Sequence, residues 1–321
     1  MIIITGANGF IGSGVVTEVL KHFPNEEILP VDTVSSTTHN LLTGKKTLPL
    51  TSPQAMWETI DSNKAIITCF IHLGACSSTT EADWDYLVEN NIEFSKKIFS
   101  WCTENKLPLL YASSASVYGD GEHGFIESLD TEILVPLNLY GKSKCDFDTW
   151  VLTQQATPPL WYGLRFFNVF GPNEYFKGPM ASVAYKAYKQ IKETGSLNLF
   201  KSYNPDYKDG EQMRDFVYVK DITNWIIELI NKKPVSGIYN MGYGAARSWM
   251  DMAKAMFTSL DIPIKINWIE MPENIQAHYQ YFTKANMEKW KQAKLSDPSF
   301  PLELAIADYI QNHLEKDEKV Y

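Results

Sequence analysis

A tyrosine and a lysine stand four residues apart at Tyr140 and Lys144, about 26 residues after Ser114. Side chains at positions i and i+4 of a helix lie on the same face. A lysine ammonium one turn from a phenol, whose ordinary pKa is about 10, is expected to favour the phenolate. The tyrosine can then take the proton of a hydroxyl group to which Ser114 hydrogen-bonds. The three residues together indicate redox chemistry at an alcohol.

Each of these residues also has a simpler interpretation. A Tyr–Lys pair at this spacing is most often a surface contact, and a serine after a strand most often caps a turn or a helix. The glycine-rich loop at the start of the chain supplies the context that favours catalysis.

That loop can hold the phosphates of a dinucleotide. Gly6, Gly9 and Gly12 come directly after an apolar segment and open a helical pattern. Such a loop places backbone N–H groups and the positive end of a helix against a pyrophosphate. Asp32 stands 20 residues after Gly12, where a carboxylate can accept the adenosine ribose 2′-hydroxyl.

The charges near Asp32 favour NAD over NADP. Residues 33–44 contain no lysine or arginine that could neutralise a 2′-phosphate. Only Lys45 and Lys46 lie close in sequence. From charge alone, the site is expected to hold NAD.

The elements that must position these residues alternate between strands and helices. We expect strands at 1–5, 28–32, 66–73, 107–113 and 161–167, and helices near 11–22, 81–104 and 139–156. Such alternation predicts an α/β fold of the Rossmann type, with a doubly wound parallel sheet. Ser114 then follows the end of a strand, where such sheets place their ligands.

Beyond Gly171 the pattern loosens, which predicts a smaller, interleaved α/β substrate lobe. We expect a helix at 180–193, a polar stretch at 201–212, a strand near 215–219, a return to the sheet through 240, and a solvated helix end at 315–319. The dinucleotide-binding domain is expected to comprise 1–167 and about 214–241, and the substrate-binding lobe about 168–213 and 242–321.

The composition argues against several classes of protein. The 321 residues carry a net charge of −9 and contain no lysine or arginine cluster, which argues against a nucleic-acid surface. No signal peptide precedes the first strand, and no apolar stretch approaches the roughly 20 residues needed to cross a bilayer. We therefore expect a cytoplasmic protein without membrane contact. The four cysteines lack CxxC spacing, so no metal site is expected.

Motifs from residue 1 to about 285 resemble those of the extended short-chain dehydrogenases/reductases of the nucleotide-sugar epimerase group. They lie at 74–81, 90–91, 111–115, 136–138, 165–172, 177–184, 214–219 and 279–280. The block that starts at Lys177 narrows the resemblance to the ADP-glyceromanno-heptose 6-epimerase family, since the wider group lacks it. This resemblance implies epimerisation at C6″ of an ADP-linked heptose for lipopolysaccharide synthesis, a bound NADP, and a homo-oligomer that is a pentamer.

The resemblance also implies a role for each matching position. Tyr140, Ser114 and Lys144 would act at the reacting hydroxyl, and Lys177 would be a second acid or base on the opposite face of the substrate. The cofactor would contact Gly6, Gly9, Phe10, Ile11, Gly12, Asp32, Thr33, Leu73, Gly74, Ala75, Cys76, Ser77, Asn90, Lys144, Val169 and Lys177. The substrate would contact Ser114, Asn168, Pro179, Lys186, Phe200, Lys201, Ser202, Arg214 and Tyr279, with Arg214 holding the diphosphate.

Several positions depart from that family. Thr33 follows Asp32 where the family has an asparagine, and a lysine that usually comes soon afterwards is missing, so NAD and NADP both stay open. Pro179 and Lys186 replace a serine and a histidine, and the loop between Phe200 and Arg214 is longer than usual.

Two alternatives follow from these departures. One is an epimerase or reductase of another nucleotide sugar. The other is a catalytically silent dinucleotide-binding regulator, which would not need Ser114, Tyr140 and Lys144 together. A sugar dehydratase is disfavoured because Ala115 and Ser116 supply no acid.

Overall fold

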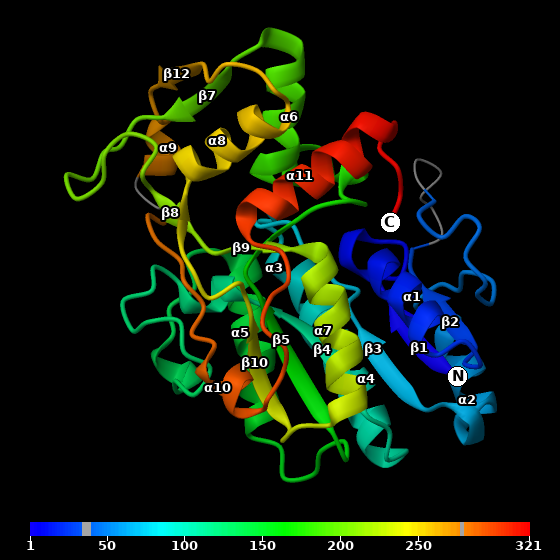
Figure 1. Ribbon diagram of the computed structural model, residues 1–321. Coiled ribbons are helices and arrows are strands. Elements are labelled where there is room, and N and C mark those ends of the chain that lie inside the picture. Colours follow the sequence, from blue (N-terminus) through cyan, green and yellow to red (C-terminus); the bar gives the residue numbers. More distant parts are fainter. Residues whose placement is uncertain (34–39, 277–278) are drawn as a thin grey trace.

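The computed structural model describes residues 1–33, 40–276 and 279–321. Its centre is a parallel sheet of six strands in the order β10-β5-β4-β3-β1-β2 (Figure 1). These strands are β1 (Ile2–Thr5), β2 (Ile28–Val31), β3 (Cys69–His72), β4 (Leu109–Ser114), β5 (Trp161–Phe166) and β10 (Gly237–Met241). The strand order reverses between β1 and β3, so the predicted doubly wound Rossmann-type sheet is confirmed.

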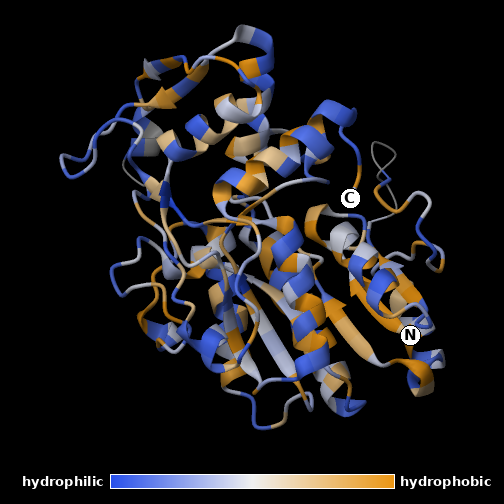
Figure 2. Ribbon diagram, in the orientation of Figure 1, coloured by the Kyte–Doolittle hydropathy of each residue, from blue (hydrophilic) through white to orange (hydrophobic). Residues whose placement is uncertain are grey.

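Helices cover both faces of this sheet. Ile2 and Ile4 share one core with α1 (Phe10–His22) and α7 (Val219–Lys232). The intervening Ile3 belongs to the core on the other face, with α4 (Phe94–Glu104) and α5 (Leu139–Leu152). Because successive side chains of a strand point to opposite faces, a strand buried on both sides must be apolar throughout. Figure 2 shows these apolar strands between the two helical layers.

The expected helix at 81–104 is interrupted by a π-helical segment. It begins as α3 (Trp84–Leu87), continues as η2 (Val88–Glu93) with a wider turn, and ends as α4. Asp83 caps the start by accepting the Tyr86 N–H, which is why the helix begins later than predicted. The remaining short helices of this domain are α2 (Met56–Ser62), η1 (Lys64–Ile66), η3 (Ala115–Tyr118) and η4 (Thr131–Ile133).

A second core supports the smaller lobe, which lies above the carboxyl ends of the strands in Figure 1. It is built by α6 (Val183–Thr194), α8 (Trp249–Ser259), α11 (Leu302–Asn312) and the parallel pair β7 (Leu197–Phe200) and β12 (Ile266–Ile269). The shorter elements are β6 (Asn168–Phe170), η5 (Tyr175–Met180), β8 (Met213–Arg214), β9 (Phe216–Tyr218), β11 (Arg247–Ser248), α9 (Glu273–Gln276), α10 (Glu288–Gln292) and η6 (Leu314–Lys316).

The return of the chain to the central sheet is later than expected. β9 pairs with β6, and β8 pairs with β11, in separate two-stranded ladders. Only β10 joins the six-stranded sheet, beside β5. The segment before α7 therefore forms the junction between the sheet and the lobe.

The four cysteines are free thiols. In the part of the chain that the structure describes, no cluster of three or more His, Cys, Asp or Glu side chains is arranged to hold a metal ion. Among the same residues, no helix is both long enough and apolar enough to span a membrane.

Candidate active site

A cleft of about 620 Å³ opens between the sheet and the lobe, at the carboxyl ends of β1, β3 and β4. Side chains from both parts of the molecule line it. Sixteen residues predicted from the sequence lie along it: Gly6, Gly9, Phe10, Ile11, Gly12, Asp32, Leu73, Gly74, Ala75, Ser77, Ser114, Tyr140, Lys144, Asn168, Val169 and Lys177.

The glycines at the start of α1 allow a very close turn. Gly6 has a φ of 67°, and a Cβ there would lie 2.7 Å from the Gly74 nitrogen. A Cβ at Gly12 would lie 1.9 Å from the carbonyl oxygen of Gly6. Any larger residue would push α1 away from the loop. With glycine at both positions the helix stays close, and its first turn lines the cleft, as a pyrophosphate requires.

Asp32 stands at the end of β2 with its carboxylate held by main-chain donors. It accepts the Asn8 N–H at 2.9 Å and the Thr33 N–H at 2.8 Å, while Thr33 itself is exposed. Lys45 does not face Asp32. Its ammonium donates to the Ser13 carbonyl at 2.7 Å and to the Thr17 hydroxyl at 2.6 Å, on α1.

Ser114 and Tyr140 meet at the rim of the sheet. Ser114 ends β4 and caps η3 by accepting the Ser116 N–H at 3.1 Å. Tyr140 lies in the first turn of α5, where Asn138 caps the helix by accepting the Gly141 N–H at 2.7 Å. The Ser114 hydroxyl lies close enough to the Tyr140 phenol to lower the pKa of that phenol. The cap therefore fixes the phenol beside the serine.

The charge state predicted for Tyr140 is wrong for the protein alone. Burial raises the pKa of Tyr140, and the nearby Ser114 hydroxyl only partly opposes that rise. Burial also lowers the pKa of Lys144 to about 8, against the attraction of Asp148. The Lys144 ammonium donates to the Ala112 carbonyl at 3.1 Å. Burial disfavours the charged forms of both residues, so proximity alone does not produce a phenolate.

Lys177 approaches the cleft from the irregular segment η5. Its Nζ lies 5.2 Å from the centre of the Phe10 ring, at the start of α1. Burial lowers the pKa of Lys177, and the nearby Glu174 carboxylate opposes that shift. Gly178 follows with a φ of 51°, which ends the segment in a tight bend.

Arg214 lies behind the cleft wall, between two aromatic rings. Its guanidinium carbon is 5.6 Å from the centre of the Trp249 ring and 5.2 Å from that of Tyr279. Trp249 lines the cleft and donates from Nε1 to the Tyr279 hydroxyl at 3.0 Å. On the cleft side, the Asn168 amide oxygen accepts from Thr283 at 3.2 Å.

Seven predicted substrate residues do not line the cleft, and Arg214 and Tyr279 are two of them. Lys186 is exposed and donates to the Pro179 carbonyl at 3.1 Å. Lys201 is paired with Glu270 at 2.5 Å, next to the end of β7. The other five outside the cleft lining are Pro179, Lys186, Phe200, Lys201 and Ser202.

Asn90, a predicted cofactor contact, does not line the cleft, and its neighbour Asn91 has a structural role. Asn90 donates to the Tyr86 carbonyl within its own helix. Asn91 is fully buried; it accepts the Cys76 N–H at 2.8 Å and donates to the Cys76 carbonyl and the Ser143 hydroxyl, each at 3.0 Å. The π-helical turn changes which face each residue presents. Asn91 therefore ties the loop at Cys76 to α5.

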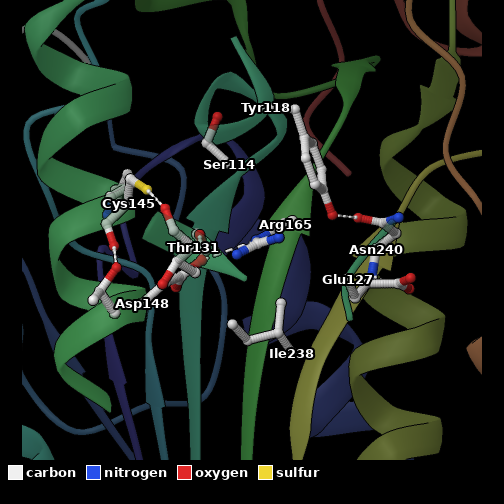
Figure 3. Close-up of polar contacts among 12 residues, drawn as sticks. Ser114, Tyr118, Glu127, Thr131, Cys145, Asp148, Arg165, Ile238 and Asn240 are labelled. Carbon is white, nitrogen blue, oxygen red and sulfur yellow. Dashed lines mark hydrogen bonds and ion pairs between the residues drawn. The ribbon is translucent and has the colours of Figure 1, made fainter. Parts of the chain in front are cut away.

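Sequence reasoning missed a buried ion pair behind Lys144. Asp148 accepts from Arg165 Nε at 2.9 Å, from Ser113 at 2.9 Å and from Tyr111 at 3.1 Å. Figure 3 shows Asp148 of α5 facing Arg165 of β5, beside Ser114. Asp148 stands one turn after Lys144, so the i+4 spacing on α5 could have identified it. The ion pair holds α5 against β5, and the bonds from Ser113 and Tyr111 hold it against β4, the strand that ends at Ser114.

Comparisons with known proteins show what this chain is similar to. The family model described as "NAD dependent epimerase/dehydratase family" matches residues 2–242. The ADP-L-glycero-D-manno-heptose-6-epimerase of Fusobacterium nucleatum is 41% identical, over 99% of each chain. The crystal structure of the Helicobacter pylori enzyme of the same name is 27% identical, with a TM-score of 0.81 over 97% of this chain and 95% of that chain.

A more distant solved structure shares the fold. The Thermus thermophilus UDP-glucose 4-epimerase, in complex with NAD, is 18% identical, with a TM-score of 0.76 over 96% of this chain and 97% of that chain.

Proposed function

This chain belongs to the NAD dependent epimerase/dehydratase family, and from that premise we propose that it inverts C6″ of an ADP-linked glycero-manno-heptose, from D-glycero to L-glycero. The observation that carries the proposal is that Tyr140 and Lys177 line one cleft together with the glycine-rich loop. One group comes from the sheet domain and the other from η5, so two proton-transfer groups approach a shared space from different elements. The product would supply heptose for lipopolysaccharide.

The chain's own residues would handle the protons and the orientation of the sugar. Bound in the cleft, a nicotinamide cofactor supplies a hydride acceptor and donor for C6″. Tyr140 must first lose its own proton, which the Lys144 ammonium one turn away favours; as the phenolate it then takes the hydroxyl proton, and Ser114 holds the same oxygen. After the resulting ketone turns over in the site, Lys177 returns a proton to the oxygen on the other face. Two separate proton-transfer groups let either epimer form, with no net consumption of cofactor.

We propose NAD as the cofactor, although the resemblance implies NADP. Asp32 lines the cleft and is aligned by the Asn8 and Thr33 N–H groups, which suits a ribose hydroxyl donor. Lys45 is engaged on α1 and would have to leave three acceptors to meet a 2′-phosphate. Residues 34–39, which follow Asp32, lie outside the described part of the chain.

Arg214 is proposed to hold the substrate diphosphate. Among the described residues, no carboxylate is within salt-bridge distance of this guanidinium, and its side chain is almost fully buried. A buried cation without a counter-ion is costly, so an anionic ligand would stabilise the site. Trp249 and Tyr279 would have to adjust so that the diphosphate reaches Arg214 from the cleft. The substrate then supplies the missing charge.

The test is to incubate the purified protein with ADP-D-glycero-D-manno-heptose and to resolve the two C6 epimers. We expect an equilibrium mixture without added cofactor, since a cofactor returned to its starting state stays bound. Identifying the dinucleotide released on denaturation decides between NAD and NADP. Recovery of a single unchanged epimer from a protein that contains its cofactor would contradict the proposal.

A second candidate is an epimerase of another nucleotide sugar. It is favoured by the predicted substrate residues that do not line the cleft, including Pro179 and Lys186. A panel of ADP-, UDP- and GDP-linked sugars, compared by kcat/KM, separates the two candidates. We also propose a homo-oligomer, on the resemblance alone, which sedimentation of the purified protein tests.

A further inference from the structure

The two residues that introduce the Lys177 segment are fully buried and face opposite parts of the molecule. Asn173 and Glu174 are both 0% exposed, although they lie on an irregular stretch between β6 and α6. Asn173 has a φ of 79°, in the left-handed region that asparagine tolerates better than most residues. A bend of this kind sends adjacent side chains in different directions.

Asn173 points to the cofactor helix. Its Nδ2 donates to the Ser13 hydroxyl at 2.9 Å, and Ser13 lies about one turn after Phe10 on α1. Lys177 contacts the ring of Phe10 on the same helix. The segment 173–177 is therefore docked on the first turns of α1 at two points. This is the helix whose start faces the proposed pyrophosphate site.

Glu174 points into the smaller lobe. Its carboxylate accepts the Gly171 N–H at 3.1 Å, the Ser182 hydroxyl at 2.8 Å and the Tyr309 hydroxyl at 3.1 Å. It also accepts the Ser182 N–H at 2.5 Å, so it joins the start of α6 to α11. A buried carboxylate with four donors is a fixed point rather than a mobile side chain.

The last residue of the chain closes the Asn173 contact from outside. The Tyr321 N–H donates to the Asn173 Oδ1 at 2.7 Å, and the Tyr321 oxygen accepts from Asn173 Nδ2 at 3.2 Å. The same oxygen accepts from Lys45 at 2.9 Å and from Thr17 at 3.1 Å. Residues 315–319 are largely exposed, but Tyr321 is docked on α1. Figure 1 shows the red segment next to the blue helix α1.

Lys177 lies on the short 3₁₀ segment η5, which is broken at the next residue, Gly178. It lies between the positive φ of Asn173 and that of Gly178, outside any α-helix or strand. In contrast with the tyrosine on α5, its position depends on side-chain contacts made by its neighbours. Misplacement of a catalytic group by about 1 Å costs on the order of 10²-fold in rate, so these contacts have a direct bearing on turnover.

We propose that Asn173, Glu174 and the main chain of Tyr321 form a latch that fixes Lys177 over the cofactor helix, and that they are positioning residues for the second proton transfer. This inference rests on the proposed function, because it assigns the proton transfer to Lys177. The latch joins three parts of the chain that lie far apart in sequence: α1, the 173–177 segment and the C-terminal residue. None of its members needs to touch the substrate.

Three variants test the latch without changing Lys177. Ending the chain after Val320 removes the Tyr321 main-chain contacts, and Tyr321→Phe is the matched control. The control keeps those contacts and loses only the hydroxyl, which bonds to Glu18 and Thr223. Asn173→Gly removes the side chain at a φ that glycine accepts. Ser13→Ala is a milder change that removes one partner of Asn173 on α1.

Two measurements on the full protein separate positioning from general damage. With substrate deuterated at C6″, transfer of deuterium to the bound cofactor reports the first step, which uses Tyr140. Appearance of the other epimer reports both steps. For the shortened chain and Asn173→Gly we expect epimerisation to fall about 10²-fold, with deuterium transfer within a few-fold of the parent protein. Ser13→Ala should fall less, and Tyr321→Phe should behave as the parent.

A third measurement does not depend on turnover. Acetylation of Lys177 by an amine-reactive reagent, followed by mass spectrometry, reports how firmly this half-buried lysine is held. Exposed Lys186 serves as the reference within the same protein. We expect faster acetylation of Lys177 in the shortened chain and in Asn173→Gly, and no change in the ratio for Tyr321→Phe.

The outcomes distinguish this inference from the proposed function. An unchanged acetylation ratio in both latch variants, or equal losses in deuterium transfer and epimerisation, would overturn the latch. If a variant fails to fold, the Ser13→Ala protein gives the same comparison on a milder scale. A parent protein that epimerises no heptose would overturn the proposed function, while the acetylation ratios would still decide the latch.

Discussion

The two proposed proton-transfer groups are held in very different ways. Tyr140 stands in the first turn of a regular helix, which Asn138 caps and the buried Asp148 ties to β4 and β5. Lys177 stands on an irregular segment that depends on its neighbours' contacts with α1, α6 and the last residue. A regular helix fixes a side chain by local hydrogen bonds, whereas an irregular segment needs long-range ones. The position of Tyr140 therefore depends mainly on its own helix. The position of Lys177 depends on contacts between parts of the chain that are far apart in sequence.

The largest expected effect is that of Tyr140→Phe. The substitution removes the phenolic proton acceptor and keeps the ring, so both the oxidation step and epimerisation should fall by about 10²–10⁴-fold. The rate of deuterium transfer from labelled substrate checks the first step. Retained cofactor and an unchanged unfolding transition would show that the loss is chemical. Near-normal deuterium transfer in this variant would show that Tyr140 takes no part in the first proton transfer. The comparison between Tyr140 and Lys177 would then fail.

Lys177→Ala should affect only one of the two steps. We expect epimerisation to fall by about 10²-fold or more, because no group then returns a proton on the second face. Deuterium transfer, folding and cofactor content should survive, since Tyr140 and α5 are untouched. Resolution of the C6 epimers over time measures the loss. Full epimerisation by this variant would refute a second proton-transfer role for Lys177.

Asp148→Asn tests, through the stability of the protein, whether the buried ion pair holds α5, the helix of Tyr140, in place. It leaves the Arg165 guanidinium buried without its carboxylate, so the free energy of unfolding should fall by about 3–5 kcal/mol. Urea unfolding measures the change. The control is Asp146→Asn on the same helix, which breaks the exposed pair with Lys142 and should cost less than about 1 kcal/mol. Equal costs for the two variants would show that the buried pair does not hold α5 in place.

The features that depend on neighbouring residues, those around Tyr140 and Gly6, could be predicted from the sequence. The spacing of Tyr140 and Lys144, and the turn at Gly6, follow from helix periodicity and from backbone freedom, which depend on few residues. Both therefore appear at the expected place beside the cleft. The late start of α3 follows from the Asp83 cap, which is also a local signal.

The rest could not be predicted because it depends on contacts between distant residues. The π-helical turn places Asn91, rather than Asn90, against Cys76, and no short-range pattern signals that extra residue in the turn. Likewise, the pKa of Tyr140 follows from burial by the whole site rather than from the nearby lysine. The docking of Tyr321 on Asn173 joins positions almost half the chain apart.

The smallest expected effect is a shift in the pH dependence of epimerisation in Glu174→Gln, which is separate from the fall in kcat that the loss of this latch residue should cause at every pH. Burial lowers the pKa of Lys177, Lys186 lowers it further, and the Glu174 carboxylate raises it. Without that carboxylate the ammonium should lose its proton at a lower pH, so the alkaline limb of the kcat profile for epimerisation should move to lower pH. The pH dependence of deuterium transfer should stay in place, because Tyr140 and Lys144 keep their surroundings. Glu193→Gln, at an exposed position on α6, is the matched control. A uniform fall in kcat at every pH, with the limb unmoved, would show that Glu174 holds the segment without influencing the charge of Lys177.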